Sequence, residues 1–332
     1  MEQKNLGRTG LRVSELALGT MSFSGDEDGH RVLDAFADAG GTFIDTADMY
    51  ARGESEEILG RWLAKRRRED FVIATKVWGR MGDAPNDQGL GRKHLVAAVE
   101  ASLRRLGTDY VDLYQTHIWD AWTPLEETLA TLDSLVTAGK VRYLGTSNVT
   151  PAQLQRSLDL ARHSGWQPYV CLQPRYNLLC RETEWELLPL CAEQGVGVIP
   201  WGPLAGGWLT GKYRRGMESV PEGSREAHWQ QRSGKEGWRT KATEETWRVL
   251  DALDEVGEQT GRTPSQVALR WLAEQPGVTA PILGPRTAEQ LADHLGAVGW
   301  TLTPSQRTRL DAASARPLPY PYEMQSRLGD TR

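Results

Sequence analysis

The sequence predicts an α/β protein folded as a (β/α)8 TIM barrel. Along the 332 residues, eight short apolar runs rich in β-forming residues alternate with longer amphipathic segments. Buried strands joined by helical crossovers form parallel sheets, and eight such units can close into a barrel. A doubly wound sheet is the alternative, but no GxGxxG motif follows the first run. We therefore expect one barrel domain over residues 1–332.

The expected strands and helices alternate in order along the chain. Strands are predicted at 15–20, 42–45, 71–77, 110–117, 141–147, 169–174, 196–201 and 280–284. Helices are predicted between them at 30–40, 54–67, 92–107, 124–139, 150–165 and 182–195. Many of these helical segments end in glycine, as helices often do. Further along, Thr263-Pro264 and Thr303-Pro304 have the N-cap and first-turn pattern of two more helices.

Two segments fall outside this alternation. Residues 4–14 carry Gly7 and Gly10 at turn positions, and we expect them to form a short hairpin that plugs the bottom of the barrel. Residues 213–240, after the seventh strand, are polar, charged and glycine-rich and contain Trp229 and Trp238. A loop of this length without secondary structure is usually functional or disordered. We expect a long active-site loop over about 213–240.

The composition excludes several classes of function. The net charge of −5 gives no electrostatic footprint for nucleic acid, and no apolar run approaches the ~18 residues of a membrane span. A polar start and three cysteines without a CxxC motif favour a reducing, cytoplasmic location. The six histidines form neither HxH nor HExxH, so no metal site is predicted. The sequence also lacks the GxSxG motif of a nucleophile elbow.

Four residues fall where a barrel places its active site, at the C-terminal ends of the strands. Asp45 ends the second strand and Tyr50 follows it, while Lys76 lies on the third strand and His117 ends the fourth. We expect Asp45 to pair with Lys76, because a buried carboxylate is costly without a partner. The ammonium would lower the pKa of the Tyr50 hydroxyl from its ordinary value near 10, so that Tyr50 can donate a proton. With His117 binding the receiving oxygen, the four residues suit the reduction of a carbonyl group.

Each of these four residues has a simpler explanation when it is taken alone. The Asp–Lys pair is often only a structural ion pair, a single histidine is often a hydrogen-bonded part of the scaffold, and a tyrosine can cap a loop. Their coincidence at one barrel mouth, on consecutive strands, favours a functional role.

A glycine-rich segment, WGPLAGGWLTGKY (201–213), follows the seventh strand. Gly206 to Lys212 matches the start of a P-loop, but Tyr213 stands where Ser or Thr should bind Mg²⁺, which argues against hydrolysis of a nucleoside triphosphate. A glycine-rich turn with a lysine can still wrap a diphosphate. Barrel phosphate sites often form after strands 7 and 8, where GPRTAEQL (284–291) leads into a helix.

Together these motifs resemble those of the aldo-keto reductase superfamily over nearly the whole chain. The matching segments are LALGTMSF (16–23), FIDTADMYARGESEEILG (43–60), VIATKV (72–77), DLYQTH (112–117), GKVRYLGTSN (139–148), LQPRYNLL (172–179), WGPLAGGWLTGKY (201–213) and PILGPRTAEQL (281–291). They are most similar to the branch that includes potassium-channel β-subunits and bacterial aldehyde and deoxysugar reductases. The resemblance implies a barrel that reduces carbonyls with NADPH. It also implies a catalytic tetrad of Asp45, Tyr50, Lys76 and His117, with Tyr50 as the general acid.

The same resemblance implies the cofactor contacts. NADP(H) would touch Gly19, Thr20, Met21, Asp45, Ser147, Asn148, Gln173, Trp201, Gly202, Pro203, Leu204, Gly206, Lys212, Arg225, Gly284, Arg286, Gln290, Asp293 and His294. Trp201 would stack near the nicotinamide, and Arg286 suits a 2′-phosphate, hence NADP over NAD. Three positions depart from the pattern of the branch. Asp293-His294 replaces the usual Glu-Asn at the adenine end, and Gly202 replaces a common Ser.

The substrate is a small carbonyl compound in this interpretation. Trp78, Trp119 and Trp122 follow strands 3 and 4, and we expect them to wall a roomy pocket for an aromatic or sugar-like compound. Packing of the barrel rim is the alternative role of these tryptophans. Two other functions stay open, an NADP-binding regulatory or sensor protein with weak catalysis, and a dedicated deoxysugar or natural-product reductase. The presence of His117 favours an enzyme, and monomer and homo-oligomer are both open.

Overall fold

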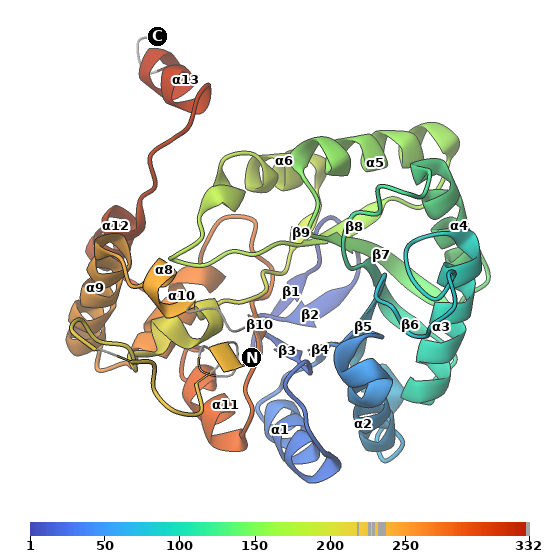
Figure 1. Ribbon diagram of the computed structural model, residues 1–332, viewed down its shortest axis with the longest axis horizontal. Helices are drawn as coiled ribbons and strands as arrows, with labels where there is room; N and C mark the ends of the chain where they lie inside the picture. The colour runs from blue at the N-terminus through green and yellow to red at the C-terminus, as the bar shows by residue number, and fades with distance from the viewer. Residues whose placement is uncertain (218, 225–226, 228–229, 232–236, 330–332) are drawn as a thin grey trace.

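The computed structural model describes residues 1–217, 219–224, 227, 230–231 and 237–329. Its centre is a parallel sheet with the strand order β10-β3-β4-β5-β6-β7-β8-β9. The strands are β3 (Ala17–Gly19), β4 (Phe43–Asp45), β5 (Val72–Val77), β6 (Val111–Thr116), β7 (Val141–Ser147), β8 (Tyr169–Gln173), β9 (Gly197–Val198) and β10 (Ile282–Leu283). Val198 bridges Val278 in parallel, and the N–H of Ile282 donates to the carbonyl of Pro200 at 2.9 Å. These contacts close the ring of strands, so the predicted (β/α)8 barrel is confirmed (Figure 1).

Helices surround this ring of strands (Figure 1). In the first part of the chain they are α1 (Asp26–Asp38), α2 (Glu54–Leu63), α3 (Arg92–Leu106), α4 (Leu125–Thr137), α5 (Pro151–Ser164) and α6 (Leu187–Gln194). Later come α8 (Gly237–Lys241), α9 (Glu244–Thr260), α10 (Pro264–Ala273), α11 (Ala288–Leu295), α12 (Pro304–Ser314) and α13 (Tyr322–Gly329). Short 3₁₀ helices are η1 (Tyr50–Gly53), η2 (Arg68–Asp70), η3 (Glu182–Glu184) and η4 (Ala205–Thr210). The helix predicted over 182–195 is therefore divided into η3 and α6.

The ends of the helices follow local chemistry. Helix α1 begins at Asp26, four residues before its predicted start, and its acidic first turn complements the positive end of the helix dipole. The predicted N-caps Thr263 and Thr303 are confirmed. Each hydroxyl accepts a hydrogen bond from the backbone N–H three residues later and forms a capping box. Helices α3, α5 and α6 end at a glycine in the left-handed conformation, as the sequence predicts.

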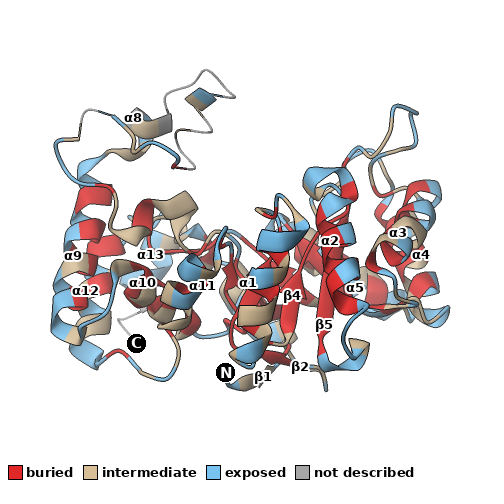
Figure 2. Cartoon of the chain, turned by 90° about the horizontal axis from the view of Figure 1, so that it is seen from below, coloured by how far each residue is buried: buried red, intermediate tan, exposed pale blue. Residues whose placement is uncertain are grey.

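The N-terminal hairpin closes one end of the barrel. Strands β1 (Gln3–Asn5) and β2 (Arg12–Ser14) pair antiparallel, and Figure 2 shows them at the end opposite to α8. The side chains of Leu6 and Val13 are fully buried and pack with apolar residues from the inner face of the strands. The backbone N–H of Arg8 donates to the carbonyl of Gly195 at 2.8 Å, which ties the hairpin turn to the segment before β9. The predicted hairpin therefore plugs the bottom of the barrel.

The long segment after β9 is anchored by aromatic side chains. Tyr213 stacks on Trp208 of η4 with ring centroids 4.4 Å apart, and Trp238 of α8 stacks on the same indole at 5.2 Å. Trp238 also meets Trp247 of α9 at 6.1 Å. The two ends of the predicted 213–240 loop are thus held in one aromatic cluster (Tyr213, Trp208, Trp238 and Trp247). Trp229 lies outside the described residues.

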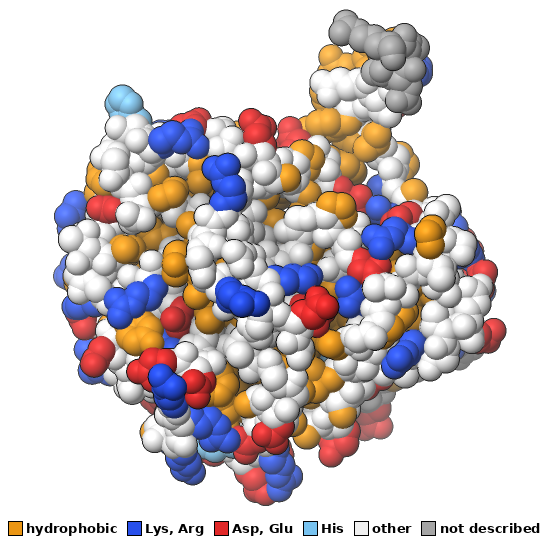
Figure 3. Space-filling model, turned by 180° about the vertical axis from the view of Figure 1, so that it is seen from behind, with side chains coloured by type: hydrophobic (Ala, Val, Ile, Leu, Met, Phe, Trp, Pro, Cys, Tyr) orange, Lys and Arg blue, Asp and Glu red, His pale blue; other side chains and the backbone are white. Residues whose placement is uncertain are grey.

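The C-terminal helix α13 lies apart from the barrel, beyond an extended segment that follows α12 (Figure 1). Tyr322 stacks on Trp185 at a centroid distance of 6.3 Å, which links α13 to the region of η3. On the face shown in Figure 3, Lys and Arg side chains are interspersed with Asp and Glu, and the C-terminal arm projects from the edge. Among the described helices, none combines the length and hydropathy that a membrane crossing requires.

We predict that Gly7→Ala destabilises the fold. Gly7 has a φ of 56°, and a Cβ there would lie 2.6 Å from both the carbonyl oxygen of Gly195 and the backbone nitrogen of Gly197. Backbone atoms cannot yield as a flexible side chain can, so the free energy of unfolding should fall by about 2 kcal/mol or more. Urea unfolding measures this loss.

Gly10→Ala is the matched control, because nothing lies within 4 Å of a Cβ at Gly10. Equal unfolding midpoints for the two variants would contradict the close docking of the hairpin against the barrel.

Candidate active site

The centre of the candidate site is a buried ion pair between neighbouring strands. Asp45 is the last residue of β4 and Lys76 the penultimate residue of β5, and both side chains are almost completely buried. The Nζ of Lys76 lies 2.6 Å from Oδ2 of Asp45 and donates to the carbonyl oxygen of Thr46 at 2.8 Å. A buried ammonium needs such partners, because an unpaired buried charge is strongly unfavourable.

The remaining proton of this ammonium points to Tyr50. The Nζ of Lys76 lies 3.0 Å from the Tyr50 hydroxyl oxygen and 4.7 Å from the centroid of its ring. A tight turn after Tyr50 places the ring there, since Ala51 and Arg52 adopt left-handed φ values of 47° and 56°. Non-glycine residues rarely adopt this conformation, and such strain is often found at functional sites. The structure therefore brings Asp45, Lys76 and Tyr50 together in one hydrogen-bonded chain.

Two glutamines fix the second oxygen of the Asp45 carboxylate. Oδ1 of Asp45 accepts hydrogen bonds from Nε2 of Gln115 at 3.1 Å and from Nε2 of Gln173 at 2.9 Å. Gln173 was expected at the cofactor, but Gln115 was missed. The sequence signal for Gln115 is an amide side chain two positions before His117. Alternate residues along a strand lie on the same face, so Gln115 and His117 are expected on one side. The two glutamines hold the carboxylate of Asp45 in one position, so that it can hold Lys76 in turn.

Charge and burial set the protonation states in the site. Burial alone would lower the pKa of Lys76, but the charge of Asp45 and the interaction with Tyr50 outweigh it and raise this pKa. Burial, followed by the nearby charge of Lys76, lowers the pKa of His117 to about 3. The imidazole of His117 is therefore neutral near pH 7, and its ring meets that of Tyr50 edge-on at 5.8 Å. A neutral histidine can donate a hydrogen bond to a carbonyl oxygen without carrying charge.

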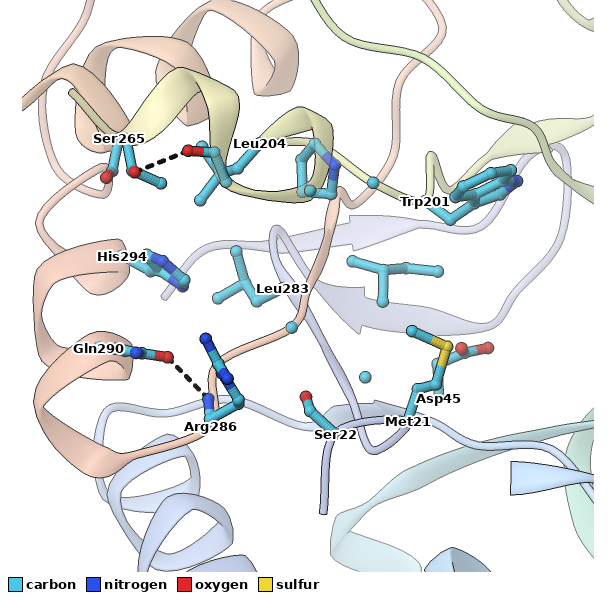
Figure 4. Close-up of a pocket in the computed structure, with 18 of the residues that line it drawn as sticks. Met21, Ser22, Asp45, Trp201, Leu204, Ser265, Leu283, Arg286, Gln290 and His294 are labelled. Carbon is cyan, nitrogen blue, oxygen red and sulfur yellow. Dashed lines mark hydrogen bonds between the residues drawn. The ribbon is translucent and has the colours of Figure 1, made fainter. Parts of the chain in front are cut away.

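A cavity of about 870 Å³ opens over these residues. Asp45, Tyr50 and His117 line one end of it, and Lys76 lies behind them. Of the expected cofactor residues, those that line the cavity are Gly19, Met21, Asp45, Ser147, Asn148, Gln173, Trp201, Gly202, Pro203, Leu204, Gly206, Lys212, Gly284, Arg286, Gln290, Asp293 and His294. Figure 4 shows that the labelled residues among them come from separate parts of the chain and surround one space. The cavity thus runs from the tetrad to the N-terminal end of α11.

Two expected cofactor residues are not among the lining residues. Thr20 is fully buried and donates from its hydroxyl to Thr46 at 2.8 Å, so it supports the floor of the site. Arg225 lies outside the described residues. Sequence reasoning missed several residues that do line the cavity, which are Ser22, Met49, Gly207, Thr210, Ser265, Ile282, Leu283 and Glu289.

Beside the tetrad, a chain of hydrogen bonds joins four of the expected cofactor residues, Ser147, Asn148, Gln173 and Trp201. The amide nitrogen of Asn148 donates to the carbonyl of His117 and to the hydroxyl of Ser147, both at 2.9 Å. Its amide oxygen accepts from the indole N–H of Trp201 at 3.1 Å, and the Ser147 hydroxyl donates to the carbonyl of Gln173 at 2.7 Å. The ends of β6, β7 and β8 are therefore joined to Trp201 in the segment after β9, and Trp201 is 37% exposed.

The middle of the cavity is a glycine-rich turn. Gly202, Gly206 and Gly207 have φ values of 65°, 71° and 98°. A Cβ at Gly207 would lie 2.6 Å from Nζ of Lys212, so the lysine ammonium lies directly over the backbone of the turn. A concave backbone with an ammonium beside it suits a diphosphate.

At the far end, α11 presents polar groups to the cavity (Figure 4). Oε1 of Gln290 accepts from the backbone N–H of Arg286 at 2.9 Å, and the guanidinium of Arg286 donates to the carbonyl of Gly223 at 3.1 Å. Oδ1 of Asp293 is engaged outside α11, by the hydroxyl of Thr263 at 2.8 Å. His294 is buried, which lowers the pKa of its ring, and its Nδ1 has no hydrogen-bond partner among the described residues. The polar groups of Arg286, Gln290, Asp293 and His294 suit contacts with the base end of a dinucleotide.

The three tryptophans expected at the substrate lie elsewhere on the rim. Trp122 is 96% exposed, Trp119 borders a separate small polar cavity, and Trp78 packs against the core under the helices. None of them is among the residues that line the large cavity. Met21 and Met49, which are 52% and 41% exposed, line it near Tyr50 instead. A substrate role of the three tryptophans stays a prediction. Among the described residues, no group of His, Cys, Asp and Glu has the arrangement of a metal site.

Comparison with known proteins agrees with this geometry. Residues 15–315 match the model of the Aldo/keto reductase family. The chain is 39% identical over 311 residues to the uncharacterized oxidoreductase YrpG of Bacillus subtilis (strain 168), covering 90% of this chain and 91% of the relative. It is 33% identical over 353 residues to the aldo-keto reductase NECHADRAFT_45914 of Fusarium vanettenii, with 96% and 92% covered.

A probable voltage-gated potassium channel subunit beta of Oryza sativa subsp. japonica is similarly close. It is 36% identical over 326 residues, which are 94% of this chain and 96% of the relative. All of these matches extend across the barrel and its candidate site. The chain therefore belongs to the aldo/keto reductase family, and it is an oxidoreductase that uses a nicotinamide cofactor and acts on a small-molecule substrate.

Proposed function

We propose that the protein reduces an aldehyde or ketone to an alcohol with NADPH, and that Tyr50 donates the proton. The observation that carries this proposal is the buried chain from Asp45 through Lys76 to the Tyr50 hydroxyl, with distances of 2.6 and 3.0 Å. When bound, the nicotinamide supplies a hydride. The protein must then supply the proton and stabilise the charge on the carbonyl oxygen, and both tasks match the residues at this end of the cavity.

Tyr50 is the general acid in this mechanism. As its proton leaves, negative charge develops on the phenolic oxygen 3.0 Å from the ammonium of Lys76. The ammonium is already in place and cannot turn away, because Asp45 and the carbonyl of Thr46 hold it. Preorganised charge of this kind stabilises the transition state without reorganisation. Asp45 acts indirectly, because it keeps Lys76 charged and in position.

His117 orients the substrate carbonyl. Its ring lines the cavity beside Tyr50 and is neutral near pH 7, since its pKa is about 3. A neutral imidazole N–H can donate to the carbonyl oxygen while the Tyr50 hydroxyl donates from another side. The two donors together fix the oxygen for protonation.

NADP rather than NAD is the proposed cofactor. Lys212 and Arg286 are basic residues along the cavity, Lys212 at the glycine-rich turn and Arg286 before α11. A guanidinium suits a phosphate through paired hydrogen bonds. The guanidinium of Arg286, at the end of the cavity beside α11, therefore supports recognition of a 2′-phosphate.

The chemistry of the cavity near Tyr50 supports an uncharged carbonyl compound. The side chains there are the thioethers of Met21 and Met49 and the indole of Trp201, while the carboxylate of Asp45 is engaged by Lys76 and two glutamines. Methionine side chains adapt to different shapes, which favours a range of apolar or aromatic compounds. A dedicated deoxysugar or natural-product reductase remains the second proposal within this class.

The alternative to an enzyme is a regulatory protein. The similarity to a probable potassium channel subunit beta is the basis for this alternative, an NADP-binding regulatory protein with weak catalysis. The complete tetrad supports the enzyme instead. NADPH oxidation over a panel of aldehydes, ketones and keto-sugars separates the two, because tight NADPH binding without turnover would support the regulatory role.

Three further properties are proposals on the same basis. The three free cysteines support a cytoplasmic location, and we expect one domain over the whole chain, with a monomer and a homo-oligomer both open in solution. Light scattering of the purified protein tests the oligomeric state.

We predict that Tyr50→Phe and Lys76→Met lose turnover while they still bind NADPH. Removal of a positioned general acid should lower kcat by ~10² or more. Steady-state kinetics with a fluorescence titration of NADPH separates the two effects. Tyr110→Phe is the control, since Tyr110 precedes β6 at the opposite end of the barrel. Full activity of Tyr50→Phe would rule out its role as proton donor.

We also predict that Arg286→Ala discriminates between the two cofactors. Loss of a guanidinium that binds a 2′-phosphate should raise the Kd of NADPH about tenfold or more and leave the Kd of NADH nearly unchanged. Titration with both nucleotides measures the ratio. Equal weakening of both would remove the 2′-phosphate assignment.

A further inference from the structure

A buried carboxyl group behind the active site has no part in the proposed mechanism. Asp48 lies in the turn between β4 and η1, two residues before Tyr50, and its exposed fraction is 0%. Neither of its carboxyl oxygens makes a hydrogen bond of good geometry to a described residue. Its backbone N–H donates to the carbonyl of Lys76 at 3.1 Å, so this residue lies directly beside the lysine of the tetrad.

The surroundings of Asp48 contain charges of both signs. Glu56 of α2 is fully buried, and its two oxygens accept hydrogen bonds from the hydroxyl of Thr75 at 2.5 Å and from Nε of Arg105 at 2.7 Å. Arg105 of α3 is thereby committed to Glu56. On β6, the hydroxyl of Tyr114 is fully buried and has no partner among the described residues. Asp48 therefore faces one carboxylate, one cation that is already paired, and the ammonium of Lys76.

This environment favours the neutral carboxylic acid. Ionisation would place a charge in a buried position without a hydrogen bond of good geometry, which is costly. Burial, followed by the carboxylate of Glu56, raises the pKa of Asp48 to about 7. The backbone N–H of Met49 and the positive charges of Arg105 and Lys76 oppose part of this rise. Asp48 is thus a carboxyl group that changes charge near neutrality, beside a site where proton transfer takes place.

The charge of Asp48 matters for Tyr50. In the proposed reduction, negative charge develops on the phenolic oxygen, and Lys76 stabilises it. A second carboxylate beside Lys76 opposes that negative charge and offsets part of the stabilisation by the ammonium. Proton donation by Tyr50 should therefore be faster while Asp48 is neutral, and slower once it is ionised.

We propose that Asp48 is a positioning residue that is held as a neutral acid and sets the upper pH limit of proton donation by Tyr50. The proposal rests on the proposed reductase function. It assigns a role to a residue that touches neither the substrate nor the cofactor cavity and acts through Lys76 and Tyr50.

The first test is the pH profile of kcat for carbonyl reduction. The wild-type kcat should fall as the pH rises through about 7, where Asp48 ionises. His117 is not the source of such a change, because its pKa is about 3. Asp48→Asn keeps the shape of the side chain and cannot ionise, so its profile should be flat there. Asp109→Asn, at an exposed position before β6, is the matched control and should keep the wild-type profile.

A second variant covers the case in which Asp48→Asn folds poorly. Glu56→Gln removes the carboxylate that opposes ionisation of Asp48 and leaves Arg105 without its partner, so the fall in kcat should move to lower pH. A fall in kcat at the wild-type pH in both Asp48→Asn and Glu56→Gln would overturn the proposal.

The third test needs no turnover. Because the pKa of Asp48 is raised above its ordinary value, the stability linked to its proton is complete at low pH and is lost as the pH rises through about 7. The Tm of Asp48→Asn minus the Tm of the wild type should therefore increase as the pH rises from about 4 to about 8. A difference in Tm that does not change with pH would overturn the proposal.

The kinetic and thermal tests also separate this inference from the reductase function. If no carbonyl compound is reduced while the Tm difference follows the pH as expected, the reductase function fails and the role in proton donation fails with it, but the buried acid is established. If turnover is normal and the Tm difference is constant, Asp48 alone is wrongly assigned.

Discussion

The burial of one ammonium group, that of Lys76, is the constraint on which the rest of the site depends. Its exposed fraction is 0%, and a lysine of this kind is stable only with a partner for each of its protons. Asp45, the carbonyl of Thr46 and the hydroxyl of Tyr50 provide the three partners. In the proposed mechanism, one of these three partners, the Tyr50 hydroxyl, is the proton donor. The hydrogen bond that satisfies the lysine is therefore also the one that would prepare Tyr50 for the proposed proton transfer.

The barrel makes this arrangement possible because it brings residues that are distant in sequence to one rim. Asp45, Lys76, Gln115 and Gln173 come from four strands, and the parallel register places Lys76 beside Gln115. The opposite end of the barrel is filled by Leu6 and the rest of the hairpin plug. Water therefore cannot reach the ion pair through the bottom of the barrel, and the low polarity there strengthens the interaction between the charges.

The strand order was predictable from the sequence, and so was the meeting of the four residues of the proposed tetrad at one rim, because each depends on a local pattern. A β-rich run shows where a strand ends, and the ends of parallel strands converge at the same rim. Gln115 was missed because an amide within an apolar run has no motif of its own. Its importance comes from its contact with Asp45, which is 70 residues away in the sequence.

Side-chain direction was the part that sequence reasoning could not supply. Trp119 and Trp122 follow a strand at the mouth, but position along the chain does not say whether an indole faces the cavity, a neighbouring helix or solvent. Asp293 and His294 are adjacent in the sequence, and Thr263 from another helix engages the carboxylate of the first while the ring of the second keeps an unpartnered nitrogen. Such differences depend on tertiary contacts, and no local pattern encodes them.

The aromatic cluster at the two ends of the 213–240 segment has a consequence for how this fold can change. Tyr213 and Trp238 contact the same indole of Trp208, so the segment leaves the barrel and returns to it at nearly the same point. A loop whose ends are already joined tolerates changes in length, because doubling a flexible loop costs only about 0.6 kcal/mol of closure entropy. Insertions and deletions between these two rings would alter the segment that contains Gly223, whose carbonyl accepts from Arg286 at the cavity, and would leave the strand register untouched. Evolution or design could therefore change the surroundings of Arg286 without disturbing the buried ion pair of Asp45 and Lys76.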